Sequence, residues 1–327
     1  MQPRLPTFAD IVAAHARLEP HLVATPLIEH PALNARTEGR VLLKCENLQR
    51  VGAFKFRGAY NKIAQVDRAR FPGGVVACSS GNHAQGVAAA ASLLGMRSAI
   101  VMPSDAPELK IARTRAFGGE VIGYDRERED RDAIARRICE ERKAAYVHPY
   151  DDPDVMAGQG TAGLEIMQQA DAIGAVPDAV LVCASGGGLV GGIAVAVKER
   201  NPATEVYSVE PEGFDDLARS LASGKRERNE RLSGSLCDAL LMPTPGEIPF
   251  EVAKRLLEGG LAVSDQEACA AVRFAFEELK LVLEPGGAVA LAAVLSGRLP
   301  VRGRTIAVVL SGGNVDPRVF SDIICGR

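Results

Sequence analysis

DAVLVCASGGGLVGGIAVAVKER, residues 178–200, contains the three parts of a parallel α/β unit. Its apolar run 178–184 predicts a buried strand, the glycines of 185–192 predict a turn, and 189–200 predicts a helix. The same alternation recurs along the chain, with strands expected at 41–46, 74–79, 97–102, 119–124, 205–210 and 305–310 and helices at 82–95, 107–117, 127–143, 160–173, 265–280 and 286–297. The expected fold class is therefore α/β with mainly parallel sheets.

The composition is that of an ordinary globular protein. The 327 residues are 47% apolar and 24% charged, and the net charge is −3. These values argue against a nucleic-acid partner and against a polybasic membrane patch. The sequence has no run of about 20 apolar residues, and its first ten residues lack the apolar core of a signal peptide. A cytoplasmic location is expected, with no membrane partner.

The cysteines argue against a disulfide framework and against a zinc cluster. There are 7 of them, an odd number, and no C-x-x-C pair occurs. Most stand among apolar neighbours, so they are expected to be small buried hydrophobic residues.

Three glycine-rich segments follow predicted strands. They are SSGNH (79–83), SGGGLVGG (185–192) and SGGN (311–314). Each leaves backbone N–H groups unpaired at a helix start or a tight turn, where anions bind. Ligands of open α/β sheets collect at the carboxyl ends of the strands, so the three segments together predict one anion-binding site.

The middle segment also has a second interpretation. Gly186, Gly188 and Gly191 spell G-x-G-x-x-G between a strand and a helix. Glu210 ends the next strand at about the spacing of a ribose-binding acid. An NAD-dependent oxidoreductase is therefore an alternative, although it leaves the other two glycine segments unexplained.

A lysine between two aromatic residues is the candidate nucleophile. GAFKFRGA (52–59) places Lys55 between Phe54 and Phe56 after a predicted strand. Partial desolvation lowers the pKa of an ammonium group and makes the amine reactive. A surface lysine whose stem packs on aromatic rings would have the same local sequence.

The four segments occur in the order of a known family. The lysine motif, SSGNH, SGGGL and SGGN together resemble the fold-type II pyridoxal 5′-phosphate (PLP) enzymes, particularly serine/threonine dehydratases and serine racemase. The resemblance implies a tryptophan synthase β-like fold, in which helices flank two open, twisted, mainly parallel sheets and PLP lies in the cleft between two domains. It implies a large PLP-binding domain at 1–69 and 149–327, a small domain at 70–148, and a homodimer.

The resemblance also implies a role for each site residue. Lys55 would carry PLP as a Schiff base, and Ser80 would be the acid or base on the opposite face of the cofactor. The substrate carboxylate would bind at Ser80, Gly81, Asn82 and His83. The other cofactor contacts would be Phe54, Asn82 at the phenolic oxygen, Ser185, Gly186, Gly187, Gly188 and Leu189 at the phosphate, Ser311 at the pyridine nitrogen, and Glu284 near the ring.

A divalent cation is implied by VEPEGFDD (209–216). In metal-activated relatives a glutamate, a backbone carbonyl and an aspartate bind the ion, and the matching positions are Glu210, Phe214 and Asp216. Oxygen donors of this kind suit Mg²⁺, Mn²⁺ or Ca²⁺. Two acids at a strand–helix junction, one of them capping the helix, are the alternative.

The implied reaction is conversion of a β-hydroxy amino acid to a 2-oxo acid and ammonia. Threonine, serine and hydroxyaspartate stay open as substrates, because Cys237, Asp238 and Ala239 stand where relatives carry Ala-Asp-Gly and because the proline-rich loop at 240–250 is unusual. An amino-acid racemase and a PLP-binding protein without catalysis are the alternatives within the family.

Overall fold

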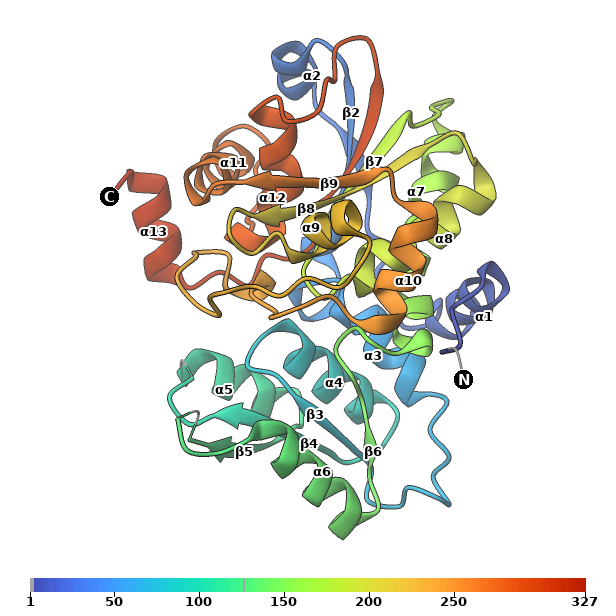
Figure 1. Cartoon of the computed structure of the whole chain (residues 1–327), viewed down its shortest axis with the longest axis vertical. Helices are drawn as coiled ribbons and strands as arrows, with labels where there is room; N and C mark the ends of the chain where they lie inside the picture. The colour runs from blue at the N-terminus through green and yellow to red at the C-terminus, as the bar shows by residue number, and fades with distance from the viewer. Residues whose placement is uncertain (1–2, 107, 126) are drawn as a thin grey trace.

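The computed structural model describes residues 3–106, 108–125 and 127–327, and two sheets organise them (Figure 1). The larger sheet has the strand order β1-β2-β10-β7-β8-β9, and only β1 is antiparallel to its neighbour. The smaller sheet has the order β5-β4-β3-β6, and its neighbours are all parallel. The α/β prediction is confirmed.

The strand bounds agree with the apolar runs of the sequence. The larger sheet contains β1 (Leu27–Glu29), β2 (Arg40–Lys44), β7 (Ala179–Cys183), β8 (Glu205–Pro211), β9 (Gly259–Val263) and β10 (Thr305–Val309). The smaller sheet contains β3 (Val75–Cys78), β4 (Ser98–Pro103), β5 (Glu120–Tyr124) and β6 (Ala145–Tyr146).

Helices cover both faces of each sheet. They are α1 (Phe8–Leu18), α2 (Pro31–Thr37), α3 (Lys55–Ile63), α4 (Asn82–Leu93), α5 (Glu108–Ala116), α6 (Arg131–Arg142), α7 (Pro153–Ala172), α8 (Gly188–Arg200), α9 (Asp216–Ser223), α10 (Glu247–Leu256), α11 (Asp265–Glu277), α12 (Pro285–Leu295) and α13 (Pro317–Cys325). Alternate residues of β7 point to opposite faces, so that Leu181 packs with α11 and α12 while Val180 and Val182 pack with α7 and α8. Both faces are buried, which explains the continuous apolar runs.

Several helix starts differ from the sequence prediction for local reasons. Asp152 accepts hydrogen bonds from the N–H groups of Asp154 and Val155, and Pro153 occupies the first turn, so α7 starts seven residues before the predicted 160. Asp130 caps α6 in the same way, so this helix starts at Arg131 and not at 127. The expected loop at 240–250 is partly wrong, because Glu247–Phe250 form the first turn of α10.

Helix α3 lies at the junction of the two sheets in Figure 1, where it packs against α4 and α7. The smaller sheet lies wholly within residues 75–146, while the predicted domain limits of 70 and 148 stay a prediction. No helix among the described residues is long and apolar enough to span a membrane. All 7 cysteines are free, and Cys45, Cys78, Cys183 and Cys237 are buried, as the sequence suggested.

Candidate active site

The lysine and the three glycine segments follow the carboxyl ends of parallel strands. Ser185 and Ser311 lie just beyond β7 and β10, which are adjacent in the larger sheet, and Lys55 starts α3 after β2, the other neighbour of β10. SSGNH follows β3 of the smaller sheet. Its helix α4 packs on the start of α3, where a Cβ on Gly86 would lie 3.1 Å from the backbone carbon of Lys55.

Lys55 has an ammonium group that no carboxylate neutralises among the described residues. Its Nζ donates to the carbonyl of Pro149 at 2.8 Å and lies 5.1 Å from the centre of the Phe54 ring. Burial lowers the pKa of Lys55 to about 8. About a tenth of this amine is therefore neutral at pH 7, and this neutral form is the one that acts as a nucleophile and a proton acceptor.

The SGGN segment packs directly on the loop before Lys55. The Phe54 N–H donates to the Ser311 carbonyl at 3.1 Å, and the Gly313 N–H donates to the Gly52 carbonyl at 2.9 Å. These backbone bonds hold Ser311 beside the lysine loop. The buried thiol of Cys183, on the adjacent strand β7, donates to the carbonyl of Val309, two residues before Ser311, at 3.4 Å.

Asn82 and Glu284 meet across the site. Asn82 Nδ2 donates to Glu284 Oε1 at 2.6 Å. A Cβ on Gly312 would lie 2.2 Å from Glu284 Oε1, so the three residues are in close contact. Burial raises the pKa of Glu284 to about 7 in spite of the hydrogen bond from Asn82. The carboxyl group is thus often protonated at physiological pH.

His83 contributes a neutral ring. Its Nε2 is 3.0 Å from the carbonyl of Val147, which can only accept, so Nε2 carries the proton. Burial, reinforced by Lys55, lowers the pKa of His83 to about 3. The ring cannot supply a positive charge to a substrate carboxylate. The donors available to a carboxylate near His83 are the backbone N–H groups at the start of α4, which have no partner within the helix.

Ser80 and Gly81 form the turn before α4. The Ser80 hydroxyl makes no hydrogen bond to any residue that the structure describes, while the Gly81 N–H donates to Ser79 Oγ at 3.2 Å. The hydroxyl of Ser80 is therefore available to a ligand.

The segment Ser185–Leu189 has the geometry of an anion cradle. Gly187 is the N-cap of α8 with a φ of 88°, a conformation that favours glycine. A Cβ on Gly186 would lie 2.5 Å from the ring of Tyr150. The backbone at position 186 can therefore lie against this ring only because glycine has no side chain. The N–H groups of the first turn of α8 have no intrahelical partners and carry the positive end of the helix dipole.

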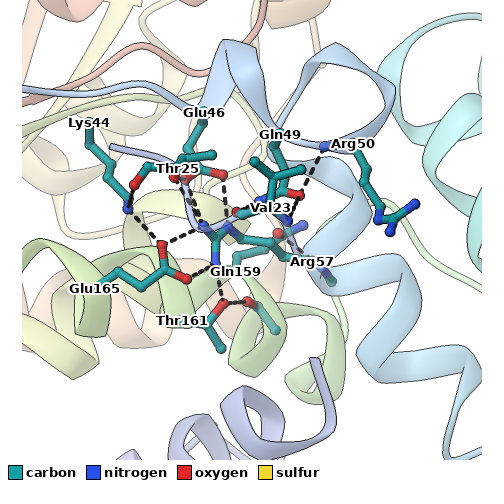
Figure 2. A network of polar contacts seen from close by, with 12 residues as sticks. Val23, Thr25, Lys44, Glu46, Gln49, Arg50, Arg57, Gln159, Thr161 and Glu165 are labelled. Carbon is teal, nitrogen blue, oxygen red and sulfur yellow. Dashed lines mark hydrogen bonds and ion pairs between the residues drawn. The ribbon is translucent and has the colours of Figure 1, made fainter. Parts of the chain in front are cut away.

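A buried ion network holds α3 in place (Figure 2). Arg57, two residues after Lys55, pairs with Glu46 and Glu165 at 2.7 Å each, and Lys44 pairs with Glu165 at 2.6 Å. Thr25 joins the network by donating to Glu46 Oε1 at 2.6 Å. Two cations are balanced by two carboxylates, so the network ties β2, α3 and α7 together without a net buried charge.

Sequence reasoning missed this network, although a signal for it was present. Lys44 interrupts the apolar run of β2, a strand that was expected to be buried, and a buried lysine requires a partner. The close approach of α3 to α7 depends on small residues, because a Cβ on Gly158 would lie 2.7 Å from Gly58 Cα.

The predicted cation ligands form a separate buried acid pair at the end of β8. Glu210 accepts from the N–H groups of Leu217 and Ala218, at 3.2 and 2.9 Å. Asp216 Oδ1 accepts from Asn229, and its Oδ2 is buried without a partner. Burial raises the pKa of Asp216 to about 7, and burial together with Asp216 raises that of Glu210.

No cluster of three or more His, Cys, Asp or Glu side chains able to hold a metal occurs in the described part of the chain. A site at Glu210 and Asp216 would therefore need the Phe214 carbonyl and water as further ligands. The two uncompensated carboxylates and the unpartnered Asp216 oxygen fit a cation.

Comparison with known proteins identifies the family. Residues 18–312 match the family model described as pyridoxal-phosphate dependent enzyme. The chain belongs to this family. The PLP-enzyme interpretation is thus confirmed, and the NAD alternative is set aside. Glu210, proposed in that alternative as the ribose ligand, instead caps α9.

Three relatives of this PLP enzyme carry informative names. L-threonine ammonia-lyase of Thermotoga maritima is 42% identical over 97% of this chain and 78% of its own length. L-threo-3-hydroxyaspartate ammonia-lyase of a Pseudomonas species is 39% identical over 99% of this chain and its entire length. The solved structure of maize serine racemase has a TM-score of 0.91 at 34% identity and covers 99% of this chain and 98% of its own.

The residues of the site fit PLP. Lys55 is a partly neutral amine, the unpaired N–H groups of the turn at Ser185–Leu189 suit a phosphate, and Ser311 and Asn82 carry polar side chains. The segment with Ser80 and His83 comes from the smaller sheet, after β3.

Proposed function

We propose that this PLP enzyme is an ammonia-lyase that converts a β-hydroxy amino acid to a 2-oxo acid and ammonia, with the cofactor attached to Lys55. The observation that carries the proposal is the Lys55 amine, with its pKa lowered to about 8, on a backbone that hydrogen-bonds segment 311–314 and packs on α4, the helix that follows segment 79–83. The names of the ammonia-lyase relatives support the reaction class.

The residues of the chain have separate tasks in this reaction. Bound PLP supplies an electron sink for the α-carbon. Segment 185–189 holds the phosphate, and the backbone N–H groups at the start of α4 hold the substrate carboxylate. Lys55 Nζ accepts the α-proton on one face and Ser80 offers its hydroxyl on the other. The β-hydroxyl takes up a proton and leaves as water, and hydrolysis of the released unsaturated amine gives the 2-oxo acid and ammonia.

Ser311 suits elimination. A serine hydroxyl does not force the pyridine nitrogen to stay protonated, whereas a carboxylate would. The Ser311 carbonyl accepts from the Phe54 N–H at 3.1 Å and the Ser311 N–H donates to the Gly287 carbonyl at 3.2 Å, so its backbone position is fixed. The milder electron sink that results favours elimination over transamination.

Racemisation is the second candidate activity. The likeness to maize serine racemase and the unengaged hydroxyl of Ser80 favour it. A proton removed by Lys55 on one face and returned by Ser80 on the other would invert the α-carbon. Threonine, serine and threo-3-hydroxyaspartate are the substrates to compare for both activities.

We also propose that a divalent cation binds Glu210, Asp216 and the Phe214 carbonyl. A chain of hydrogen bonds joins this acid pair to the cradle. Asn229 Nδ2 donates to Asp216 at 2.6 Å and to the Met242 carbonyl at 2.8 Å, and the Met242 N–H donates to Ser185 Oγ at 3.1 Å. The cation would thus stabilise the backbone that holds the phosphate.

Three further features belong to the proposal. The large domain would comprise 1–69 and 149–327 and the small domain 70–148, since all strands of the smaller sheet lie in the latter range. We further propose a cytoplasmic homodimer.

A substrate panel tests the proposed function. The L- and D-isomers of threonine, serine and threo-3-hydroxyaspartate are incubated with the PLP-loaded protein, and ammonia and 2-oxo acid are measured together. We expect equimolar release of both from at least one L-isomer, and none from Lys55→Ala. A PLP-loaded protein that releases neither product but interconverts isomers would be a racemase, and one that does neither would contradict the proposal.

A further inference from the structure

Asn314, the last residue of SGGN, has a side chain that is held at both ends. Its Nδ2 donates to the Val51 carbonyl at 2.7 Å and to Asn82 Oδ1 at 2.8 Å. Its Oδ1 accepts from Nη1 of Arg113, on α5, at 3.1 Å. The amide therefore links the loop before Lys55, the start of α4 and the smaller sheet's helix α5.

The chemistry of these partners fixes which way the Asn314 amide points. A backbone carbonyl only accepts hydrogen bonds, so the atom facing Val51 must be the nitrogen. A guanidinium only donates, so the atom facing Arg113 must be the oxygen. The orientation of an amide is ordinarily inferred from its surroundings, and here two independent partners agree on it.

This orientation determines that of the next amide. Because Asn314 Nδ2 donates to Asn82, the atom of Asn82 that receives it is Oδ1, and Asn82 Nδ2 faces Glu284 at 2.6 Å. Glu284 uses one of the two Nδ2 hydrogens. The second hydrogen is not used by any residue of the described part of the chain.

The lysine loop is shaped to accommodate Asn314. Gly52 has a φ of 72°, and a Cβ there would lie 2.8 Å from Asn314 Oδ1. The Gly52 carbonyl also accepts from the Gly313 N–H at 2.9 Å. A side chain at position 52 would push Asn314 out of reach of Asn82.

We propose that Asn314 is a positioning residue that orients the Asn82 amide so that its N–H, and not its oxygen, faces the phenolic oxygen of PLP. This inference rests on the proposed attachment of PLP to Lys55 and on the contact proposed for Asn82. An N–H donor there favours the ionised phenolic oxygen, whereas an amide oxygen would repel it. The consequence is spectroscopic, because the ionised form of the lysine-bound cofactor absorbs in the visible and the neutral phenol form in the near-ultraviolet.

Asn314→Leu in the PLP-loaded protein provides the test. Leucine keeps the branched shape and removes both the donor and the acceptor, so the Asn82 oxygen loses its partner and only the bond to Glu284 still holds the amide. A hydrogen bond to a charged group is lost, and we expect the ratio of visible to near-ultraviolet absorbance to fall about tenfold. Asn201→Leu, the same substitution at an asparagine at the end of α8, should leave the ratio unchanged.

Asn314→Asp is the second variant, and it is included in case Asn314→Leu misfolds. Aspartate keeps the shape and the partner Arg113 but can only accept, so the Asn82 amide should reverse and donate to it. The absorbance ratio should fall at least as far as in Asn314→Leu.

Repeating both substitutions in the Asn82→Leu variant shows whether Asn314 acts through the orientation of the Asn82 amide or in another way. If Asn314 acts through Asn82, Asn82→Leu should lower the ratio by itself, and adding Asn314→Leu or Asn314→Asp should lower it by less than twofold more. An unchanged ratio in both position-314 variants, or an equal fall with and without Asn82, would overturn the inference. A wild-type protein that forms no lysine-bound PLP would instead refute the proposed function.

Discussion

Lys55 and Ser80 are the two residues of the candidate site that can transfer a proton, and their side chains differ in chemistry. Lys55 is a buried amine with a lowered pKa, and Ser80 has a hydroxyl that the rest of the described chain leaves unengaged. PLP weakens the bond perpendicular to its ring, so a residue that removes the α-proton must stand above or below the ring. The two residues are proposed to stand on opposite faces.

Lys55→Ala and Ser80→Ala should therefore differ in stereochemistry. Lys55→Ala should abolish exchange of the α-proton of an L-substrate, because loss of a general base costs about 10²–10⁴-fold and the point of cofactor attachment is lost as well. Ser80→Ala should keep most of the elimination from the L-isomer and lose action on the D-isomer. Deuterium uptake from solvent, followed for each isomer, measures both. Equal loss of both isomers in Ser80→Ala would make Ser80 a residue that only positions the substrate.

Glu284 predicts a pH dependence of stability. Its folded-state pKa of about 7 lies above its ordinary 4.5. The folded state therefore binds more protons, so the group contributes stability below pH 4.5 that is lost as the pH rises through 7. In the cofactor-free protein the loss should amount to at most about 3 kcal/mol, and Glu284→Gln should remove it. Urea unfolding at several pH values checks this, and an equal pH slope in Glu284→Gln would be evidence against it.

At the scale of secondary-structure elements, the position of α3 depends on the Arg57 network. Removing one partner from a buried ion pair leaves an uncompensated charge and costs about 3–5 kcal/mol. Arg57→Met should destabilise the protein by this amount, because Glu46 and Glu165 would lose their common partner.

The exposed pair Arg142–Glu120, at 2.5 Å, provides the matched control. Arg142→Met should cost less than about 1 kcal/mol, because solvent screens an exposed pair. Denaturant unfolding of both variants gives the comparison. Similar losses for the two arginines would mean that the buried network does not hold α3.

The elements that sequence predicted best are those with a strong pattern. β7 and β10 are continuous apolar runs; β7 is one residue shorter than expected at each end, and β10 is one residue shorter at its carboxyl end. Short or amphipathic elements such as β1 and α13 were missed, since a few residues carry little periodicity. The start of α10 was assigned to a loop because Pro245, Gly246 and Pro249 are typical of turns. Pro249, however, lies in the first turn of the helix, where a backbone N–H has no intrahelical partner and proline is tolerated.

The site was predictable as a set of segments and not as a set of contacts. Glycine segments after strands predicted where a ligand could bind, because strand ends meet at one edge of a sheet. The bond from Asn82 to Glu284 joins residues 202 positions apart, and no local pattern reveals it. The same holds for Asn314 and Arg113, which only the packing of the smaller sheet brings together.

At the scale of the whole molecule, the site depends on contacts from both sheets. Lys110 of α5 pairs with Asp238 at 2.6 Å, and Arg113 of the same helix reaches Asn314. In the larger sheet's part of the chain, Asn229 and Met242 connect the acid pair to Ser185. The candidate site is thus in contact with regions outside it through these bonds.

Chelation tests the proposed cation. Removing divalent ions should lower the melting temperature and weaken PLP binding several-fold, because the buried carboxylates Glu210 and Asp216 would repel each other and loosen the cradle. Mg²⁺ or Mn²⁺ at about 100 times its Kd should restore about 2.7 kcal/mol. Asp216→Asn should lose this response. If chelator and added ions change neither property in the wild type, the acid pair is not a cation site.

The central claim is that PLP is attached to Lys55, and borohydride reduction followed by peptide mapping tests it most directly. The purified protein should be yellow, and reduction should fix one pyridoxyl group on Lys55, while Lys55→Ala should yield no modified peptide. A colourless protein, or a pyridoxyl group fixed on another lysine such as Lys44 or Lys110, would contradict the account.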